Sequence, residues 1–361
     1  MIVVVSDDAP TQLMLDKGVP GPSLKWAEEG YVVVEIRESA FDRDSVLDLA
    51  LDSLEQHEKC SPKGVVGLVA YGLGLWRKVQ HSTALGKITA AAIYAGVAGP
   101  PEPTSSIIPT IQHLSGSASM KLLRTAETMQ YDYPKMNSHL FALPTCTGFD
   151  YATEAISHSR YLTFLKKHMD GPYFDLKAIW DEHTYFEFVA RSVEHTMSTM
   201  VQEPYVNHIT TITGGIGREK LTNFYRDHII FSNPRDIESH LISRTVGIDR
   251  VVDEAIMTII FPGIPPTGLK LEIPYTAVVN IRGDRLYNEH LIWDQATVLK
   301  QLGLLPGSLP YPYSLPAGNE PGSSEFVVKL PVAGAEMAAK MRDKNAVPSN
   351  ELITAVRRQD G

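Results

Sequence analysis

The sequence predicts an α/β half followed by an α+β half, and two observations support this fold class. In residues 1–170, short apolar runs alternate with stretches of helical spacing, which is typical of a mostly parallel sheet with helices on both faces. In residues 171–305, helices come first and period-two strands then follow one another, as in an antiparallel sheet. The boundary is placed at residues 169–174, because Gly171-Pro172 stops the preceding helix.

The first half is expected to contain six buried strands. They cover residues 2–6, 31–36, 65–71, 88–96, 107–114 and 139–144. Residues 44–54 have the apolar spacing of a helix. The run at 65–71 ends in the glycine turn at 72–74, and helical spacing follows. We therefore expect a strand, a tight turn and a helix there.

The second half is expected to begin with a long helix over residues 176–200. A second helix follows the glycines of T-G-G-I-G-R at 213–218, and residues 203–208 are expected to form a loop between the two helices. The later strands are expected at residues 240–246, 250–260, 271–282 and 285–294, with Gly283-Asp284 as a hairpin turn. Residues 306–361 are interpreted as a Pro/Gly-rich tail with a short helix at about 333–343.

Composition and charge narrow the classes of function. Apolar residues make up 43% of the chain and charged residues 21%, as in an ordinary globular protein. The formal net charge of −9 argues against binding to nucleic acid or to an anionic membrane, which needs a basic face. The two cysteines, Cys60 and Cys146, do not make a disulfide framework, which favours a reducing, cytoplasmic location. No run approaches the roughly 18 apolar residues that cross a bilayer, and no secretory signal is expected.

The order of elements in the first half resembles that of the dienelactone hydrolases, a branch of the α/β hydrolases. The resemblance implies a Cys nucleophile at the turn after a strand, an Asp after a late strand and a His after the last strand. In this chain the three positions fall on Gly72, Ser119 and His139, so only the His is retained. A catalytic triad needs a nucleophile, a base and a group that orients the base. We therefore expect this half to be non-catalytic, and Cys146 to be packed rather than reactive.

Residues 176–305 resemble the SnoaL-like polyketide cyclases of the nuclear-transport-factor-two-like superfamily. Three stretches support the resemblance: T-G-G-I-G-R-E-K-L-T-N-F (213–224), D-R-V-V-D-E (249–254) and R-L-Y-N-E-H-L-I-W-D (285–294). The two halves together also resemble fungal proteins of secondary-metabolite clusters. The resemblance implies a cone built from a curved antiparallel sheet and helices, with an apolar pocket. It also implies catalysis without a metal or an organic cofactor, and a homodimer.

Polar residues near the strands of the second half are the first candidates for catalysis. His290 and Asp294 are expected on one face of the last strand and are the preferred acid/base pair. Arg282 and Tyr205 are expected to stabilise developing negative charge, and His208 is a further candidate in the loop with Tyr205. A satisfied buried ion pair would give the same sequence pattern.

A second set of residues is expected to bind the substrate. It consists of Tyr185, His195, Arg244, Glu254, Asn280 and Trp293. On the long helix, His183, Glu187, Arg191 and His195 follow one another at a spacing of four residues and drift slowly around one face. For Glu187 and Arg191, a solvated charged face explains the pattern equally well.

Two other signals carry less weight. T-G-G-I-G-R resembles a phosphate-binding loop, but it follows no strand of a βαβ unit and lacks G-K-[ST], so we interpret it as the start of a helix. The histidines show no H-x-x-x-H or H-E-x-x-H spacing, so no metal site is expected.

These observations favour a cofactor-free acid/base enzyme of fungal small-molecule biosynthesis, acting on a polyketide- or terpenoid-like substrate. Epoxide opening, with or without cyclisation, is the preferred reaction. Isomerisation or cyclisation through an enolate needs the same groups and stays open. The alternatives from other classes are an ester or lactone hydrolase that acts through the first half, and a non-catalytic binding or scaffold protein.

Overall fold

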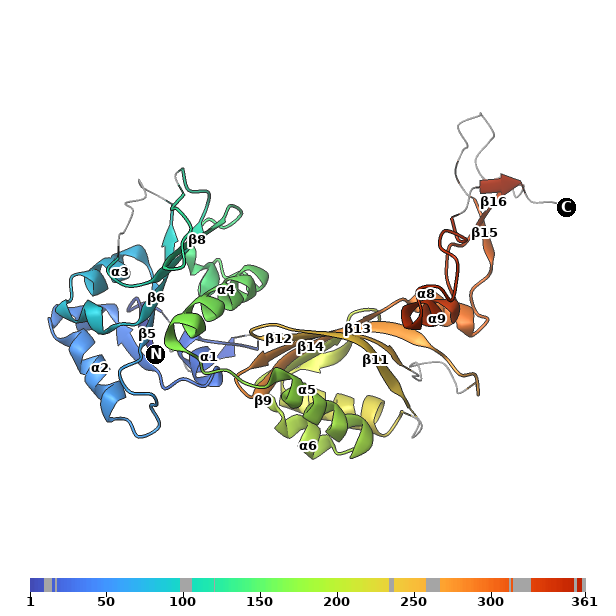
Figure 1. Ribbon diagram of the computed structural model, residues 1–361, viewed down its shortest axis with the longest axis horizontal. Coiled ribbons are helices and arrows are strands. Elements are labelled where there is room, and N and C mark those ends of the chain that lie inside the picture. The colour runs from blue at the N-terminus through green and yellow to red at the C-terminus, as the bar shows by residue number, and fades with distance from the viewer. Residues whose placement is uncertain are drawn as a thin grey trace.

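The structure of the protein is a computed structural model that describes residues 1–9, 15–16, 18–97, 106–119, 121–233, 237–257, 267–311, 313, 326–353 and 356–358. It contains a domain with a parallel sheet, a domain with a mainly antiparallel sheet and a C-terminal arm (Figure 1). The predicted succession of an α/β half and an α+β half is thus confirmed. Within these described residues, no helix is both long enough and apolar enough to cross a membrane.

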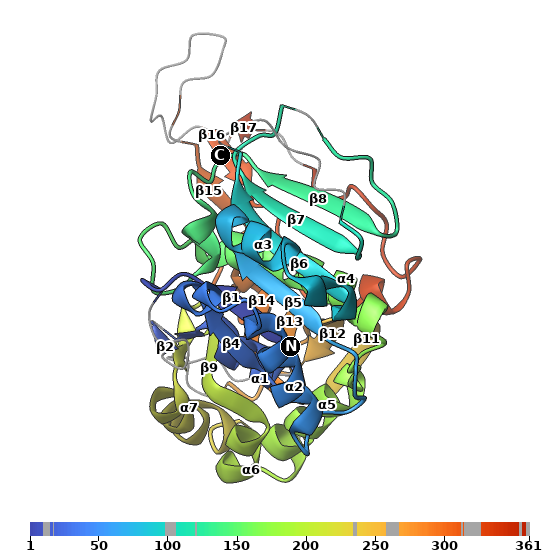
Figure 2. The ribbon, with the colours of Figure 1, turned by 90° about the vertical axis from the view of Figure 1, so that its left-hand side faces the viewer.

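The N-terminal domain is built on a six-stranded sheet in the order β4-β1-β5-β6-β7-β8, and all of its strand pairs are parallel. The strands are β1 (Ile2–Val5), β4 (Val34–Arg37), β5 (Gly67–Tyr71), β6 (Ala90–Gly96), β7 (Thr110–Ser115) and β8 (Thr128–Tyr133). A short pair, β2 (Leu15–Asp16) and β3 (Val19–Pro20), stands apart from this sheet. Figure 2 shows the parallel sheet across its width, from β8 to β4.

Helices cover both faces of the parallel sheet. They are α1 (Pro22–Glu28), α2 (Val46–Gln56), α3 (Leu73–Gln80) and α4 (Tyr151–Met169), with the 3₁₀ turns η1 (Glu38–Asp42), η2 (Thr83–Lys87) and η3 (His139–Ala142). On β1, Val3 and Val5 pack with α1 and α4 in one apolar cluster, whereas Ile2 and Val4 pack with α2 and α3 in another. Because successive side chains of β1 point to opposite faces of the sheet, they belong to two different cores. This is why β1 is apolar at every position.

Five of the six strands predicted for this half are confirmed, and the sixth is wrong. Residues 139–142 form the 3₁₀ turn η3, where the Ser138 hydroxyl accepts a hydrogen bond from the Leu140 amide. The sixth strand of the observed sheet is instead β8, which the sequence did not predict. Its T-M-Q-Y-D-Y sequence is polar enough to lie at the edge of the sheet. A short apolar run alone does not distinguish a strand from a helical turn.

The second domain has a six-stranded sheet in the order β10-β9-β14-β13-β12-β11. Its strands are β9 (Met200–His208), β10 (Thr213–Ile216), β11 (Ser239–Val246), β12 (Arg250–Met257), β13 (Ile273–Arg282) and β14 (Arg285–Trp293). All neighbouring strands are antiparallel except β14 and β9, which are parallel. The predicted hairpin at Gly283-Asp284 joins β13 and β14, and Gly283 has a φ of 57°. The last three residues of the strand predicted at 250–260 lie outside the described residues.

Helices pack against one face of this sheet, which we call the inner face (Figure 1). They are α5 (Leu176–Thr184), the π-helical turn η4 (Tyr185–Val189), α6 (Val193–Ser198), α7 (Arg218–Phe224) and the π-helical turn η5 (Tyr225–Ile230). The inner face and these helices enclose an apolar cluster that includes Trp180, Phe224, Val279 and Leu286.

Two sequence predictions in this domain are wrong. The single helix predicted over residues 176–200 is divided, because Arg191 has a φ of 51° between η4 and α6. The i+4 spacing beyond Glu187 therefore does not describe one helical face. Residues 203–208 do not form a loop; they belong to β9, whose pairing with β14 is between strands distant in sequence.

The C-terminal arm lies at the end of the second domain that is far from the N-terminal domain (Figure 1), and its first helix packs against β13. It begins with α8 (Gln295–Gln301) and contains α9 (Glu336–Arg342), which confirms the short helix predicted there. Strands β15 (Ser308–Pro310), β16 (Phe326–Lys329) and β17 (Val356–Arg358) form a small antiparallel sheet.

A buried set of charged residues joins the two domains, and we call it the junction cluster. It consists of Lys25, Glu28, Glu29, Glu154, His158, Lys166 and Arg282. Lys25 Nζ lies 2.5 Å from Glu154 Oε1, and Arg282 Nη1 lies 2.8 Å from Glu28 Oε2. The second of these pairs links β13 to α1. Three cations face three carboxylates in this cluster, so its charges are balanced.

Candidate active site

A cavity of about 250 Å³ lies between α5, η4 and the inner face of the sheet. Trp180 and Phe188 line it from the helices, and Tyr275, Ala277 and Leu291 line it from the strands. The cavity is larger than the roughly 150 Å³ that accommodates a benzene ring. It therefore has room for a ring-sized molecule with polar substituents.

A second hollow of about 340 Å³ adjoins this cavity, and we call it the mouth. Asp181, Thr184 and Phe188 are among the residues that line both spaces. Tyr185 and Val189 line only the mouth, and both are exposed. Asp181 thus lies where the two spaces meet.

Two of the carboxyl groups that line the cavity belong to Glu187 on η4 and Glu289 on β14. Their residues are 7% and 5% exposed. Across the described part of the chain, no Lys or Arg makes an ion pair with either one; Glu187 Oε2 is 3.7 Å from Nε2 of His183, and Glu289 Oε2 accepts a hydrogen bond of 3.4 Å from the Tyr225 hydroxyl. Burial without a cation makes the ionised form of a carboxyl group costly.

The pKa values of these two carboxyl groups are raised to different extents. Burial raises the pKa of Glu289 to about 7, although the hydrogen bond from Tyr225 acts in the opposite direction. Burial also raises the pKa of Glu187 well above its ordinary value, and the charge of Glu289 raises it further. The two groups titrate as a coupled pair, and the hydrogen bond from Tyr225 favours the ionised form at Glu289. One cavity then holds both a base and an acid.

Hydrogen bonds set the tautomer of His183, which is fully buried below the two carboxyl groups. Nδ1 of this ring is 2.7 Å from Thr199 Oγ1, and that hydroxyl donates its one hydrogen to the Thr196 carbonyl at 2.7 Å. The Thr199 oxygen must therefore accept from Nδ1–H, which leaves Nε2 as an acceptor. Burial lowers the pKa of His183 to about 3, so the ring is neutral. Its Nε2 faces the Tyr225 hydroxyl at 3.4 Å and Glu187 at 3.7 Å.

Both π-helical turns of the domain contribute to this group. Glu187 lies within η4, and Tyr225 is the first residue of η5. A π-helical turn changes the direction of the side chains that follow it and is frequent at functional sites. Here one turn supplies an acid to the cavity, and the other supplies a buried hydroxyl that bonds Glu289.

Arg244 on β11 forms a further wall with two carboxylates. Its Nε and Nη2 donate to the two oxygens of Asp253, both at 2.7 Å, and its Nη1 donates to Asp181 at 2.7 Å. The indole of Trp180 also donates to Asp253, at 2.8 Å. The bidentate geometry fixes the guanidinium plane, and these hydrogen bonds raise the pKa of Arg244.

Three residues of the predicted site lie at the cavity or its mouth: His208, Arg244 and Tyr185. Burial lowers the pKa of His208 to about 4, so this ring is neutral. Trp293 packs edge-on against His208, with ring centroids 5.8 Å apart, and its indole donates to Gln295. Trp293 therefore supports His208 from behind.

The structure does not bring together the preferred pair, His290 and Asp294. His290 points to the outer face of β14, where its ring lies 5.4 Å from that of Tyr205. Asp294 follows the strand and is the N-cap of α8, accepting from the amides of Ala296 and Thr297. Successive side chains of a strand alternate between faces, so with Glu289 and Leu291 inside, residue 290 must lie outside.

The other predicted site residues also lie away from the cavity. Arg282 belongs to the junction cluster, and Asn280 donates to the Asp249 carbonyl at 2.9 Å. Glu254 is exposed and accepts a hydrogen bond from Ser243. His195 is exposed on α6, where its ring stacks on Phe186.

Two residues that carry the proposed chemistry were not predicted from the sequence: Glu289, which lines the cavity, and Tyr225, which bonds it. A signal for Glu289 exists, because it shares the strand parity of Leu291 and is a lone carboxylate among apolar side chains of that face. Tyr225 gives no such signal, since an aromatic residue in an apolar helix is ordinary core.

In the N-terminal domain, Gly72 begins α3 directly after the strand β5 and has a φ of 152°. A methyl group at Gly72 would lie 3.7 Å from Nε2 of His139, so the turn and this ring are close together. Glycine supplies no nucleophile, however, and Ser119 is exposed in the segment after β7. Burial raises the pKa of the Cys146 thiol, which makes it a weak nucleophile at neutral pH.

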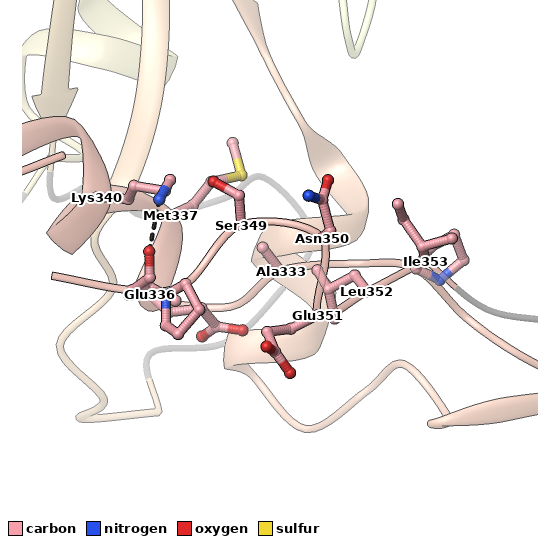
Figure 3. A pocket seen from close by; sticks show the side chains of 12 residues that line it. Ala333, Glu336, Met337, Lys340, Ser349, Asn350, Glu351, Leu352 and Ile353 are labelled. Atoms are coloured by element: carbon pink, nitrogen blue, oxygen red, sulfur yellow. Dashed lines mark hydrogen bonds between the residues drawn. The ribbon is translucent and has the colours of Figure 1, made fainter. Parts of the chain in front are cut away.

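A third hollow, of about 700 Å³, lies on the C-terminal arm beside α9 (Figure 3). Apolar side chains such as Met337, Leu352 and Ile353 line much of it, together with the polar Glu336 and Lys340. Glu336 also lies 3.6 Å from Lys300. This hollow is larger than the cavity but has no pair of buried titratable groups. Over all described residues, no group of three or more His, Cys, Asp and Glu could hold a metal ion.

Comparison with solved structures gives partial matches. A protein with a ketosteroid isomerase-like fold from Catenulispora acidiphila is 14% identical; the match covers 35% of this chain and 93% of that chain, with a TM-score of 0.30. An NTF2-like protein of unknown function from Cytophaga hutchinsonii is 9% identical, with coverages of 37% and 99% and a TM-score of 0.27. No protein-family model and no curated protein matches the sequence. Similarity this weak carries no conclusion about function, which depends on the geometry of the cavity.

Proposed function

We propose that the cavity of the second domain performs acid/base catalysis on a small organic substrate without a cofactor. The observation that supports this most is the pair Glu187 and Glu289, two buried carboxyl groups with no cation to neutralise them. A structural role would favour paired charges, because an unpaired buried carboxyl group costs stability. Shifted pKa values of this kind are typical of catalytic acids and bases.

In the proposed mechanism, Glu289 is the general base and Glu187 is the general acid. The Glu289 carboxylate removes a proton from a carbon or hydroxyl group of the substrate, and Glu187 gives its proton to a carbonyl or epoxide oxygen. The cycle leaves Glu187 ionised and Glu289 protonated, and one proton transfer between them, directly or through water, restores the starting state. Tyr225 orients the base by donating its one hydrogen to Glu289, and Nε2 of His183 lies 3.7 Å from the acid Glu187.

Isomerisation, cyclisation and epoxide opening all need this combination of groups. In epoxide opening, Glu187 protonates the ring oxygen while Glu289 deprotonates the incoming water or internal hydroxyl. In isomerisation through an enolate, the neutral Glu187 donates a hydrogen bond to the developing oxyanion. From the sequence, we also propose that the substrate is polyketide- or terpenoid-like. We propose that the enzyme is a homodimer and is located in the cytoplasm.

Two surrogate reactions test the proposal without knowledge of the natural substrate. One is hydrogen–deuterium exchange next to the carbonyl of cyclic ketones in D₂O, followed by proton NMR, and the other is hydrolysis of styrene oxide. We expect turnover that rises with pH through about 7 as Glu289 ionises. We also expect Glu289→Gln to lose roughly 10²- to 10⁴-fold in rate.

Glu254→Gln serves as the matched control, since Glu254 is an exposed carboxylate on the outer face. Turnover that survives Glu289→Gln, or no turnover of any compound in either panel, would count against the proposal. Tight binding without turnover would support a binding protein instead.

A further inference from the structure

The side chains that line the cavity and its mouth include more acids than bases, which favours some substrates over others according to their charge. Asp181, Glu187, Asp253 and Glu289 are the acids that line these spaces. Among the described lining residues, Arg244 is the only Lys or Arg, and His208 is held neutral by burial. The acids therefore outnumber the cations.

Arg244 is not available as a receptor for an anion. Three of its nitrogens already donate to carboxylates at 2.7 Å, two to Asp253 and one to Asp181. A substrate carboxylate could bind the guanidinium only by displacing one of these partners. Asp253 is 5% exposed and also accepts from the Trp180 indole, so its displacement would leave a buried charge unpaired.

The position of the Asp181–Arg244 ion pair strengthens this discrimination against anions. Asp181 lines both the mouth and the cavity, and half of its side chain is exposed. An anion that occupied both spaces would lie close to this carboxylate and to that of Glu289. Each encounter between like charges is unfavourable, and more so in the poorly solvated interior.

We propose that the cavity accepts uncharged, ring-sized molecules and rejects carboxylates and phosphates, and that the Asp181–Arg244–Asp253 cluster determines this specificity. The inference rests on the proposed function, since it names the substrate class of the same site. It narrows that class to compounds such as ketones, lactones, epoxides and phenols whose acidic groups are absent or masked. The reaction that supplies the substrate must then release it as a neutral compound rather than as a free acid.

Matched ligands of equal shape and different charge provide the test. Benzamide and cyclohexanecarboxamide are compared at pH 8 with benzoate and cyclohexanecarboxylate, using saturation-transfer NMR titrations of the full-length protein. We expect each amide to bind at least about tenfold more tightly than its carboxylate, equivalent to about 1.4 kcal/mol. Equal affinities, tighter binding of the carboxylates, or no binding by either amide overturns the proposal.

Two pairs of variants locate and explain the effect. Leu241→Trp fills the cavity from a residue that is 45% exposed and should abolish amide binding, whereas Thr245→Trp, on the exposed outer side of the same strand, should not. Asp181→Asn removes one negative charge beside Arg244 and should narrow the preference for amides, whereas Asp175→Asn, at the start of the same helix and outside the cavity, should not. A preference that Asp181→Asn leaves unchanged removes the cluster from the explanation.

This experiment is independent of turnover. If the surrogate reactions fail while the amides still bind selectively, the catalytic proposal falls and the charge selection stands. If turnover is found but carboxylates bind as well as amides, the acid/base chemistry stands and the charge selection falls.

Discussion

The junction cluster and the cavity carboxyl groups are both buried, but their charges are arranged differently. In the junction cluster, Lys25, Lys166 and Arg282 face three carboxylates, and each ion has a partner within 3.3 Å. In the cavity, Glu187 and Glu289 have only a neutral His and a Tyr as partners. Ions in balanced pairs stay charged and hold elements in place at all ordinary pH values. A buried carboxyl group without a cation instead keeps a proton near neutral pH, and it can exchange that proton with a substrate. The difference distinguishes a structural ion cluster from a site with chemistry.

The largest expected effect is the loss of stability when a substitution breaks the junction cluster. Lys25→Met leaves the carboxylate of Glu154 buried without its partner, 2.5 Å away in the native protein, and should lower the free energy of unfolding by about 3–5 kcal/mol. Urea denaturation measures this change. The control is Lys87→Met, which removes an exposed pair with Asp48 and should cost no more than about 1 kcal/mol. Equal effects of the two changes would mean that burial does not strengthen the junction cluster.

The next effect concerns the pH dependence of stability that the cavity imposes. The pKa of Glu289 is about 7 in the folded protein and about 4.5 when unperturbed. The folded state therefore holds its proton more tightly, and stability falls as pH rises from about 4.5 to about 7, by roughly 3 kcal/mol. Glu289→Gln should remove this contribution, while that of Glu187, whose pKa burial also raises, remains.

Thermal unfolding at several pH values between 5 and 8 tests this expectation, with the exposed Glu254→Gln as the control. As pH rises over this range, Glu289→Gln should gain stability relative to wild type, and the control should not; at pH 8, Glu289→Gln should be as stable as wild type, or more so. A Glu289→Gln protein that is strongly destabilised at every pH would place Glu289 with the junction cluster, as a structural group.

A smaller effect is expected on the pKa of Glu289, the proposed base. Tyr225→Phe removes the hydrogen bond that favours the Glu289 carboxylate, so the pKa of Glu289 should rise above 7. Hydrogen bonds to charged groups contribute about 1.5–3 kcal/mol, and the lower end applies at 3.4 Å. Carbon-13 NMR of the glutamate carboxyl carbons follows the titration. Tyr275→Phe is the control, because that hydroxyl bonds Ser239 instead; an equal shift in both variants would contradict the role given to Tyr225.

The smallest effect concerns Asp294, one of the two residues first predicted as the acid/base pair. Asp294→Ala removes the N-cap of α8 and should cost about 1 kcal/mol of stability. Turnover and the titration of Glu289 should stay unchanged. Asp294→Asn keeps the cap and should restore stability. A loss of turnover in both variants would return the catalytic role to Asp294 and His290.

The sequence allowed prediction of element types more readily than of the site. Alternation along residues 285–293 correctly placed Asn288, His290 and Ile292 on one side of a strand and left Glu289 and Leu291 on the other. It could not tell which side the helices would cover, since both contain polar residues. The catalytic candidate was therefore sought on the outer face. The strand β9 was also missed, because its pairing with β14 depends on contacts between residues distant in the chain.

By itself, the sequence determined the succession of an α/β and an α+β half, the Gly283 hairpin and the absence of a side chain at Gly72. These follow from local periodicity and from the conformational freedom of glycine, which neighbouring residues largely control. Only the tertiary structure decided that Glu187 and Glu289 meet in one cavity, that Thr199 fixes the tautomer of His183, and that Arg244 is already neutralised by Asp181 and Asp253. Burial and the pairing of charges are set by segments far apart in the chain, and these two quantities control the pKa values on which the proposed chemistry depends.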